Sequence, residues 1–197
     1  MSDFREQSNK DLDLGAKAYQ AGDYETAMTE EELAKRVDCR TETSEGIVWN
    51  FDVNTKRDGW AMSKSLANAK ISGGVLTADV INRKPFFVTE EANLGIDTSN
   101  YDKVSFCIRN ATPSTLAKVY FITKESPAWS EDKCVEVSVE KNDALHMAYT
   151  ADMSSNPAWS GTLKGLRIEL TGIDDFDEAM QIGLDFVKVL KNLPAKQ

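Results

Sequence analysis

The sequence lacks most of the residue patterns on which catalytic and metal sites are built. Histidine occurs once, at His146, which excludes a metal site made from two or three histidines of this chain. There is no Gly-x-Ser-x-Gly motif and no glycine-rich loop of the phosphate-binding type. Acidic residues are plentiful, but no pattern singles out two of them for glycoside hydrolysis. The sequence therefore predicts a protein that is not an enzyme.

Cysteine is scarce, and its spacing is uninformative. The three cysteines, Cys39, Cys107 and Cys134, are far apart and form no CxxC pair, so zinc-knuckle and thioredoxin-type chemistry is unsupported. An odd number leaves at least one thiol free within the chain, and buried free cysteines are the expected outcome. A bridge between Cys107 and Cys134 stays open at this point.

Signals for membranes and nucleic acids are also missing. No apolar run approaches the roughly 18 to 20 residues of a membrane span. The first residues lack the apolar segment of a signal peptide. The formal net charge is −9, and the basic residues are scattered rather than gathered into a stripe. We therefore expect neither a nucleic-acid nor a membrane partner, whereas neutral glycans or proteins are compatible with this charge.

Residues 1–44 differ from the rest and are expected to form a helical N-terminal arm or linker. Thr29–Glu32 has the pattern of a capping box, which predicts a short helix over about 30–37. Leu14–Ala27 is similar to half of a tetratricopeptide repeat, but a single repeat cannot bury its own apolar face. The arm is therefore not predicted to be a solenoid.

Residues 45–197 have the pattern of an all-β domain. Eight short apolar or alternating segments are separated by turn signals such as 110–113 and 141–143. The segments are Ile47–Val53, Val75–Ile81, Val104–Arg109, Val119–Thr123, Val135–Val139, His146–Ala151, Leu166–Leu170 and Ile182–Leu190. Many short strands without long helices between them predict an antiparallel sandwich or barrel.

The order and spacing of several segments resemble the galactose-binding-like jelly-roll modules of bacterial carbohydrate-active and cell-surface proteins. The matching segments are Trp49–Asp52, Asp58–Trp60, Gly74–Leu76, Tyr101–Asn110, Lys118–Thr123, Trp129–Glu131, Tyr149–Met153, Trp159–Ile168 and Gly183–Lys188. The resemblance covers roughly residues 45–191 and implies a β-sandwich of two antiparallel sheets. It also implies a carbohydrate-binding or structural module of a larger secreted protein.

Modules of this family often carry a structural calcium that ties the first strand to the last. The resemblance places ligands at Asp52 and Asp185, and carboxylate oxygens suit this cation. Both aspartates interrupt apolar strands, where a buried carboxylate needs a partner. Strand alternation could instead point each of them to solvent.

Carbohydrate sites combine aromatic faces with a few polar groups. Trp60, Trp129 and Trp159 stand beside turn residues and are the candidate aromatic residues, whereas Trp49 lies within a strand and is expected in the core. For each of the three candidates, packing at the rim of the sandwich is the competing interpretation.

The polar faces of alternating strands supply further candidates. Arg109, Tyr120 and Arg167 have the parity opposite to the core residues of their strands and could line a concave polar groove if the strands are neighbours. The alternative is a solvated sheet face on which the arginines pair with Glu136 or Glu169.

The sequence thus favours a non-catalytic carbohydrate-binding module, an accessory part of an extracellular glycan-degrading or cell-surface protein. Its partners would be a glycan or polysaccharide and other domains of that protein, and its cofactor a structural calcium. The alternative is a structural or protein-interaction β-sandwich without a sugar site. A lyase or hydrolase on the same fold is a third hypothesis, because a fold alone does not determine function.

Overall fold

A computed structural model describes residues 41–52, 59–89, 94–174 and 179–192 of the chain. The predicted helices of the N-terminal arm lie outside these residues. The described part begins with β1, Thr41–Glu42, which pairs with β2, Gly46–Trp49. The sheet therefore includes residues 41–42, which the sequence places in the arm.

The described strands form two antiparallel sheets, each named here after its central strand. The β13 sheet has the order β1-β2-β13-β5-β4, with β8 pairing β13 on its other side and β11 pairing β8. Its remaining strands are β4 (Leu66–Ser72), β5 (Val75–Val80), β8 (Tyr101–Ala111), β11 (His146–Asp152) and β13 (Gln181–Lys191).

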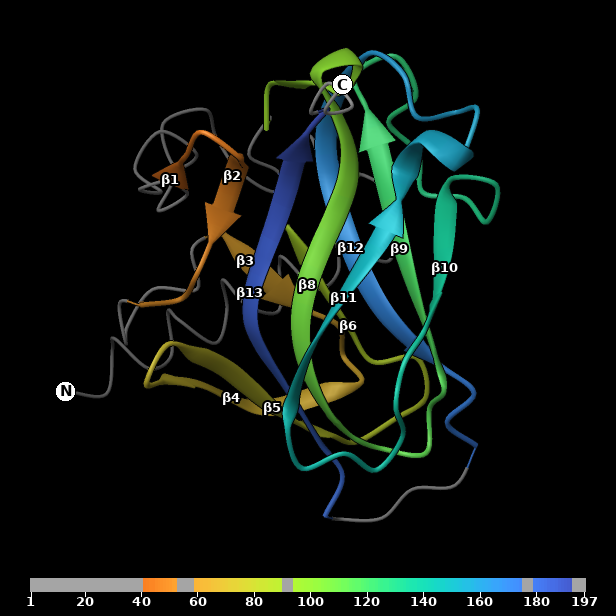
Figure 1. Cartoon of the computed structure of the whole chain (residues 1–197). Helices are drawn as coiled ribbons and strands as arrows, with labels where there is room; N and C mark the ends of the chain where they lie inside the picture. Colours follow the sequence, from red (N-terminus) through yellow and green to blue (C-terminus); the bar gives the residue numbers. More distant parts are fainter. Residues whose placement is uncertain (1–40, 53–58, 90–93, 175–178, 193–197) are drawn as a thin grey trace, which may run out of the picture. The chain divides into compact units, whose positions relative to one another are not determined.

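The β12 sheet has the order β10-β9-β12-β6-β3, with the short β7 pairing the start of β12. Its strands are β3 (Trp60–Met62), β6 (Phe86–Thr89), β7 (Ile96–Asp97), β9 (Leu116–Thr123), β10 (Cys134–Ser138) and β12 (Thr162–Thr171). Two 3-10 turns, Thr98–Asn100 and Met153–Ser155, precede β8 and follow β11. In Figure 1 the strands β8, β11 and β13 lie in front of β9 and β12.

Period-two alternation decides which residues enter the layer between the sheets. On β12, Leu166, Ile168 and Leu170 belong to the core cluster, so Arg167 and Glu169 point to the outer face. On β13 the core residues have even numbers up to Leu184 and odd numbers from Val187 onward. The change arises because a bulge at residue 185 shifts the register with β8.

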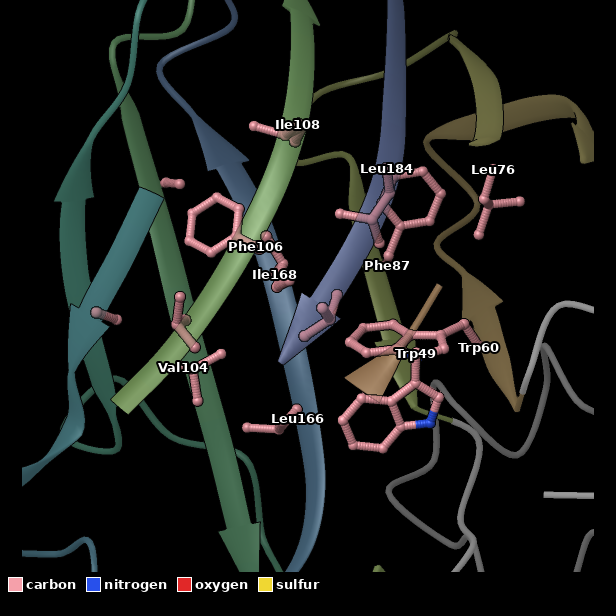
Figure 2. Packing of buried hydrophobic residues seen from close by; sticks show 14 of the residues in the cluster. Trp49, Trp60, Leu76, Phe87, Val104, Phe106, Ile108, Leu166, Ile168 and Leu184 are labelled. Atoms are coloured by element: carbon pink, nitrogen blue, oxygen red, sulfur yellow. The ribbon is translucent and has the colours of Figure 1, made fainter. Parts of the chain in front are cut away.

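The core contains two tryptophans that stabilise the sandwich. Trp49 and Trp60 are 1% and 0% exposed, and their rings meet edge to face with centroids 5.9 Å apart. Figure 2 shows both indoles among apolar side chains that include Phe87 and Leu184. Burying aromatic rings of this size is a large part of what offsets the conformational entropy of a β-sandwich.

These findings confirm the predicted antiparallel β-sandwich and the core position of Trp49. A strand lies at each of the eight segments that alternation marks in the sequence. The bridge left open between Cys107 and Cys134 is absent, because the two residues lie in different sheets and both thiols are free. None of the described residues belongs to a helix that is long and apolar enough to cross a membrane.

Candidate functional site

Arg167 is the centre of a cluster on the outer face of the β12 sheet. Strand register places Cys134, Tyr120, Arg167, Val88 and Ala61 in one row across the five strands β10, β9, β12, β6 and β3. Because side chains in one row point to the same face, Tyr120 and Arg167 are neighbours on the side away from the core. The sequence anticipated the parity of both residues.

Three aromatic rings surround the Arg167 guanidinium. Its Cζ atom lies 3.8 Å from the ring centroid of Tyr120, 5.0 Å from that of Phe86 and 5.4 Å from that of Trp129. A guanidinium within about 6 Å of an aromatic face is attracted by the ring quadrupole. Arg167 is therefore fixed between side chains from β9, β6 and the loop that joins β9 to β10.

Two carboxylates contact this group from different sides. Glu169 pairs with Arg167, with 3.2 Å between Nη2 and Oε2, and its side chain is 5% exposed. Glu131 accepts from the Tyr120 hydroxyl at 2.9 Å and from Lys118 Nζ at 2.9 Å. We call Arg167, its three rings and the side chains of Lys118, Glu131 and Glu169 the Arg167 cluster.

Burial and pairing give the two carboxylates opposite proton affinities. Burial raises the pKa of Glu169, and the Arg167 charge offsets this effect only in part. The hydrogen bond from Lys118, followed by that from Tyr120, lowers the pKa of Glu131. Burial and the hydrogen bond to Glu131 raise the pKa of Tyr120, whose ring is 1% exposed. As the pH falls, Glu169 is thus protonated before Glu131.

A buried lysine holds the loop that carries Trp129. Lys133 is 5% exposed, and its ammonium donates to Ser126 O at 3.0 Å, to Ser126 Oγ at 2.9 Å and to the Ala128 carbonyl. Desolvation lowers the pKa of Lys133. All three acceptors belong to the loop, so this cation orders the backbone directly before Trp129.

Two buried donors of the Arg167 cluster have no hydrogen-bond acceptor among the described residues. They are Arg167 Nε and Trp129 Nε1. Buried N–H groups usually have a hydrogen-bond partner, so we expect a water molecule or a ligand oxygen to accept from these two donors.

The structure separates the other predicted ligand-binding residues from this cluster. Trp60 is fully buried against Trp49, so the prediction that it offers its ring to a ligand is wrong. Trp159 is half-buried, donates from Nε1 to Tyr101 O at 2.8 Å and meets Phe121 edge to face at 5.0 Å. It therefore packs at the rim of the core, the competing interpretation for this residue.

Arg109 does not share a groove with Tyr120 and Arg167, because it lies on the β13 sheet. Its Nη2 donates to Gln181 Oε1 at 2.7 Å, and Gln181 donates to Asp79 at 2.8 Å. His146 is its register partner on β11. The predicted groove of three residues is therefore wrong. The pairing of an arginine with Glu169, part of the alternative interpretation, is found at Arg167, but these two side chains are 14% and 5% exposed and do not form a solvated face.

The two aspartates predicted to bind calcium have different neighbours. Asp52 accepts a hydrogen bond from Asn50 Nδ2, and a Cβ on Gly74 would lie 3.3 Å from its Oδ1. Asp185 lies beside Cys107, and burial together with this carboxylate raises the pKa of that thiol to about 11. Among the described residues, no three or more Asp, Glu, His or Cys side chains are placed so that they could hold a metal ion. A calcium here would depend on backbone carbonyls, and it stays a prediction.

Sequence reasoning missed several members of the Arg167 cluster. Phe86 lies on β6, a four-residue strand that the pattern did not reveal. Outside the cluster, Lys133, which holds the Trp129 loop, has no sequence signal at all. Glu131 stands two residues after Trp129, in a motif that was noticed for its tryptophan. Alternation on β9 and β12 was the signal that found Tyr120 and Arg167.

The fold is shared with modules of carbohydrate-active proteins. A family 28 carbohydrate-binding module specific for non-crystalline cellulose matches with TM-score 0.51 and 13% identity, over 77% of this chain and 94% of that chain. An exo-β-agarase and a second agarase match with TM-scores of 0.55 and 0.51 and identities of 11% and 9%. Those matches cover 79% and 74% of this chain but 26% of each agarase chain.

At these identities the likeness shows the fold, and it confirms the predicted resemblance to a β-sandwich of the carbohydrate-binding-module type. No protein-family model and no curated protein sequence matches the chain.

Proposed function

We propose that this chain is a non-catalytic carbohydrate-binding module whose binding face is the outer face of the β12 sheet. The observation that carries the proposal is the Arg167 guanidinium lying 3.8 Å over Tyr120 and beside Trp129. Sugars are bound by aromatic surface against their C–H faces and by planar polar groups against their hydroxyls. The Arg167 cluster supplies both kinds of group on one sheet face.

The cluster members would have separate roles in binding. Trp129 is half-buried on a loop, so its ring is the aromatic surface that a sugar can reach. Tyr120 is 1% exposed beneath Arg167 and would act through the guanidinium that it supports. Arg167, Glu131 and Lys118 would bind hydroxyl groups. The family 28 module, which binds non-crystalline cellulose, shares this fold and supports the choice of a glycan as ligand.

The proposal includes a place for the chain in a larger system. Both agarases contain the fold in about a quarter of their length, which supports an accessory role beside a separate catalytic domain. We propose an extracellular or cell-surface location, where polysaccharides are found.

The Arg167 cluster itself argues against catalysis by Tyr120. A tyrosine that removes a proton from substrate must give up its own, and burial raises the pKa of Tyr120 instead. The phenol therefore keeps its proton at neutral pH and donates a hydrogen bond to Glu131.

A structural or protein-interaction domain is the second candidate function. The observation that favours it is the burial of two aromatic rings of the Arg167 cluster. Tyr120 and Phe86 are 1% and 8% exposed, and the Arg167 guanidinium already lies over their faces. In that case the cluster would only stabilise the sheet.

Affinity electrophoresis in hydroxyethylcellulose and in agarose gels, followed by calorimetry with cellohexaose and agaro-oligosaccharides, distinguishes the two functions. We expect Trp129→Ala and Arg167→Gln to weaken binding at least tenfold, since central aromatic and arginine residues dominate such interfaces. Arg109→Gln, on the other sheet, is the matched control and should bind as the wild type does. Absence of binding to every probe would leave the structural function.

A further inference from the structure

The orientation of the Arg167 guanidinium depends on one carboxylate. The three rings attract the cation through their faces, but this attraction does not specify where each N–H points. Glu169 supplies a direction, because its Oε2 forms an ion pair with Nη2 across 3.2 Å and so attracts one end of the guanidinium. The pair is enclosed: the side chains of Arg167 and Glu169 are 14% and 5% exposed, although both lie on the outer face of the sheet.

We propose that Glu169 is a positioning residue that fixes the Arg167 guanidinium for the ligand, and that its protonation makes binding at this face weaken in acid. This inference rests on the proposed function, and it concerns how that site is regulated. The ligand needs no contact with Glu169, which acts through Arg167.

The charged groups around Glu169 come from every element packed against it. Arg167 lies on the same strand, Lys118 is its register partner on β9, Lys84 stands before β6, and Glu131 comes from the loop after β9. Burial raises the pKa of Glu169 more than these cations lower it. Of the two carboxylates in the cluster, Glu169 therefore takes up a proton first as the pH falls.

Linkage sets the size of the effect. A ligand that requires the oriented guanidinium binds the protein with ionised Glu169 more tightly, and bound ligand must then lower the pKa of Glu169. A difference of about one pH unit between the free and the bound protein corresponds to about a tenfold loss of affinity in acid. Glu169→Gln keeps an acceptor of the same shape without the charge, so it should bind at every pH as the wild type binds in acid.

The test uses the full chain and two independent readouts. The first is an NMR pH titration of the Arg167 Nε–H signal and of the side-chain carboxyl signals, without ligand. The second is calorimetry with cellohexaose and agaro-oligosaccharides across the same pH range. Glu169→Gln is the test variant, and Glu140→Gln, at an exposed glutamate outside the cluster, is the matched control.

We expect the Arg167 signal to shift with the Glu169 carboxyl at a common midpoint above 4.5, the ordinary value for glutamate. This shift should be absent from Glu169→Gln and present in Glu140→Gln. An Arg167 signal that ignores the Glu169 midpoint in the wild type overturns the positioning role, even if the variant fails to fold.

The calorimetry with oligosaccharides distinguishes a failure of this inference from a failure of the proposed function. Binding that weakens about tenfold in acid, and does so only when Glu169 is present, supports the inference. Binding that is independent of pH overturns it while leaving the proposed function intact. If no glycan binds at any pH, the proposed function fails and the pH regulation fails with it, while the NMR titration still decides whether Glu169 positions Arg167.

Discussion

Replacing Lys133 by methionine tests whether a buried cation orders the loop that carries Trp129. The variant removes three hydrogen bonds from the ammonium, two to Ser126 and one to Ala128. Hydrogen bonds that involve a charged group contribute about 1.5–3 kcal/mol each to stability, and more is lost where the remaining acceptor cannot reach water. Ser126 and Ala128 are exposed residues, so water can reach these acceptors after the substitution. The loss of a desolvated charge also offsets part of the cost.

We therefore expect the free energy of unfolding to fall by about 1–2 kcal/mol, measured by urea denaturation. The chain has four tryptophans, so four indole N–H signals report the local effect in a ¹H–¹⁵N NMR spectrum. The Trp129 signal should move and exchange faster with solvent, whereas those of Trp49 and Trp60 should stay. Lys124→Met, at an exposed lysine of the same loop, is the control. An unchanged Trp129 signal in Lys133→Met would refute the reasoning.

Three further outcomes follow from burial and charge. Trp60→Ala should lower the free energy of unfolding by about 3–5 kcal/mol in urea denaturation, because the ring is fully buried; an effect under about 1 kcal/mol would contradict its core position. Between pH 4.5 and the raised pKa of Glu169, wild-type stability should decrease as the pH rises, because the folded state binds the proton more tightly than the unfolded chain. Glu169→Gln should lack this slope in denaturation at a series of pH values. If calcium joins Asp52 to Asp185, chelator should lower the Tm of the wild type but not that of Asp52→Asn, and an equal Tm with and without chelator would exclude it.

Alternation and turn chemistry were sufficient to predict the all-β class. Segments such as Leu166–Leu170 alternate so cleanly that both the strand and its inward face can be inferred from the sequence. The same parity identified Tyr120 and Arg167 as outward-facing residues. Short strands were harder to predict from the sequence. β6 is four residues long and buried at every position, so it has no alternating pattern. Its Phe86 was missed for this reason.

Neighbour relations could not be predicted in the same way. Arg109 and Arg167 have the same outward parity, yet Arg109 lies on the β13 sheet and Arg167 on the β12 sheet. Trp60 stands beside turn residues, as exposed aromatics often do, but pairing of β3 with β6 directs it into the core. Each outcome depends on which distant strands pair.

By itself, the sequence determined that this chain belongs to the all-β class, which residues of most strands face outward, and that common catalytic motifs are missing. These properties are local, because a period of two residues and a turn signal can be read from a few neighbouring positions. Only the tertiary structure decided that Arg167 meets three rings and a buried glutamate, one of the rings, Phe86, lying 81 positions away in the sequence. Strand pairing and burial made that cluster, and both arise from contacts across the whole fold.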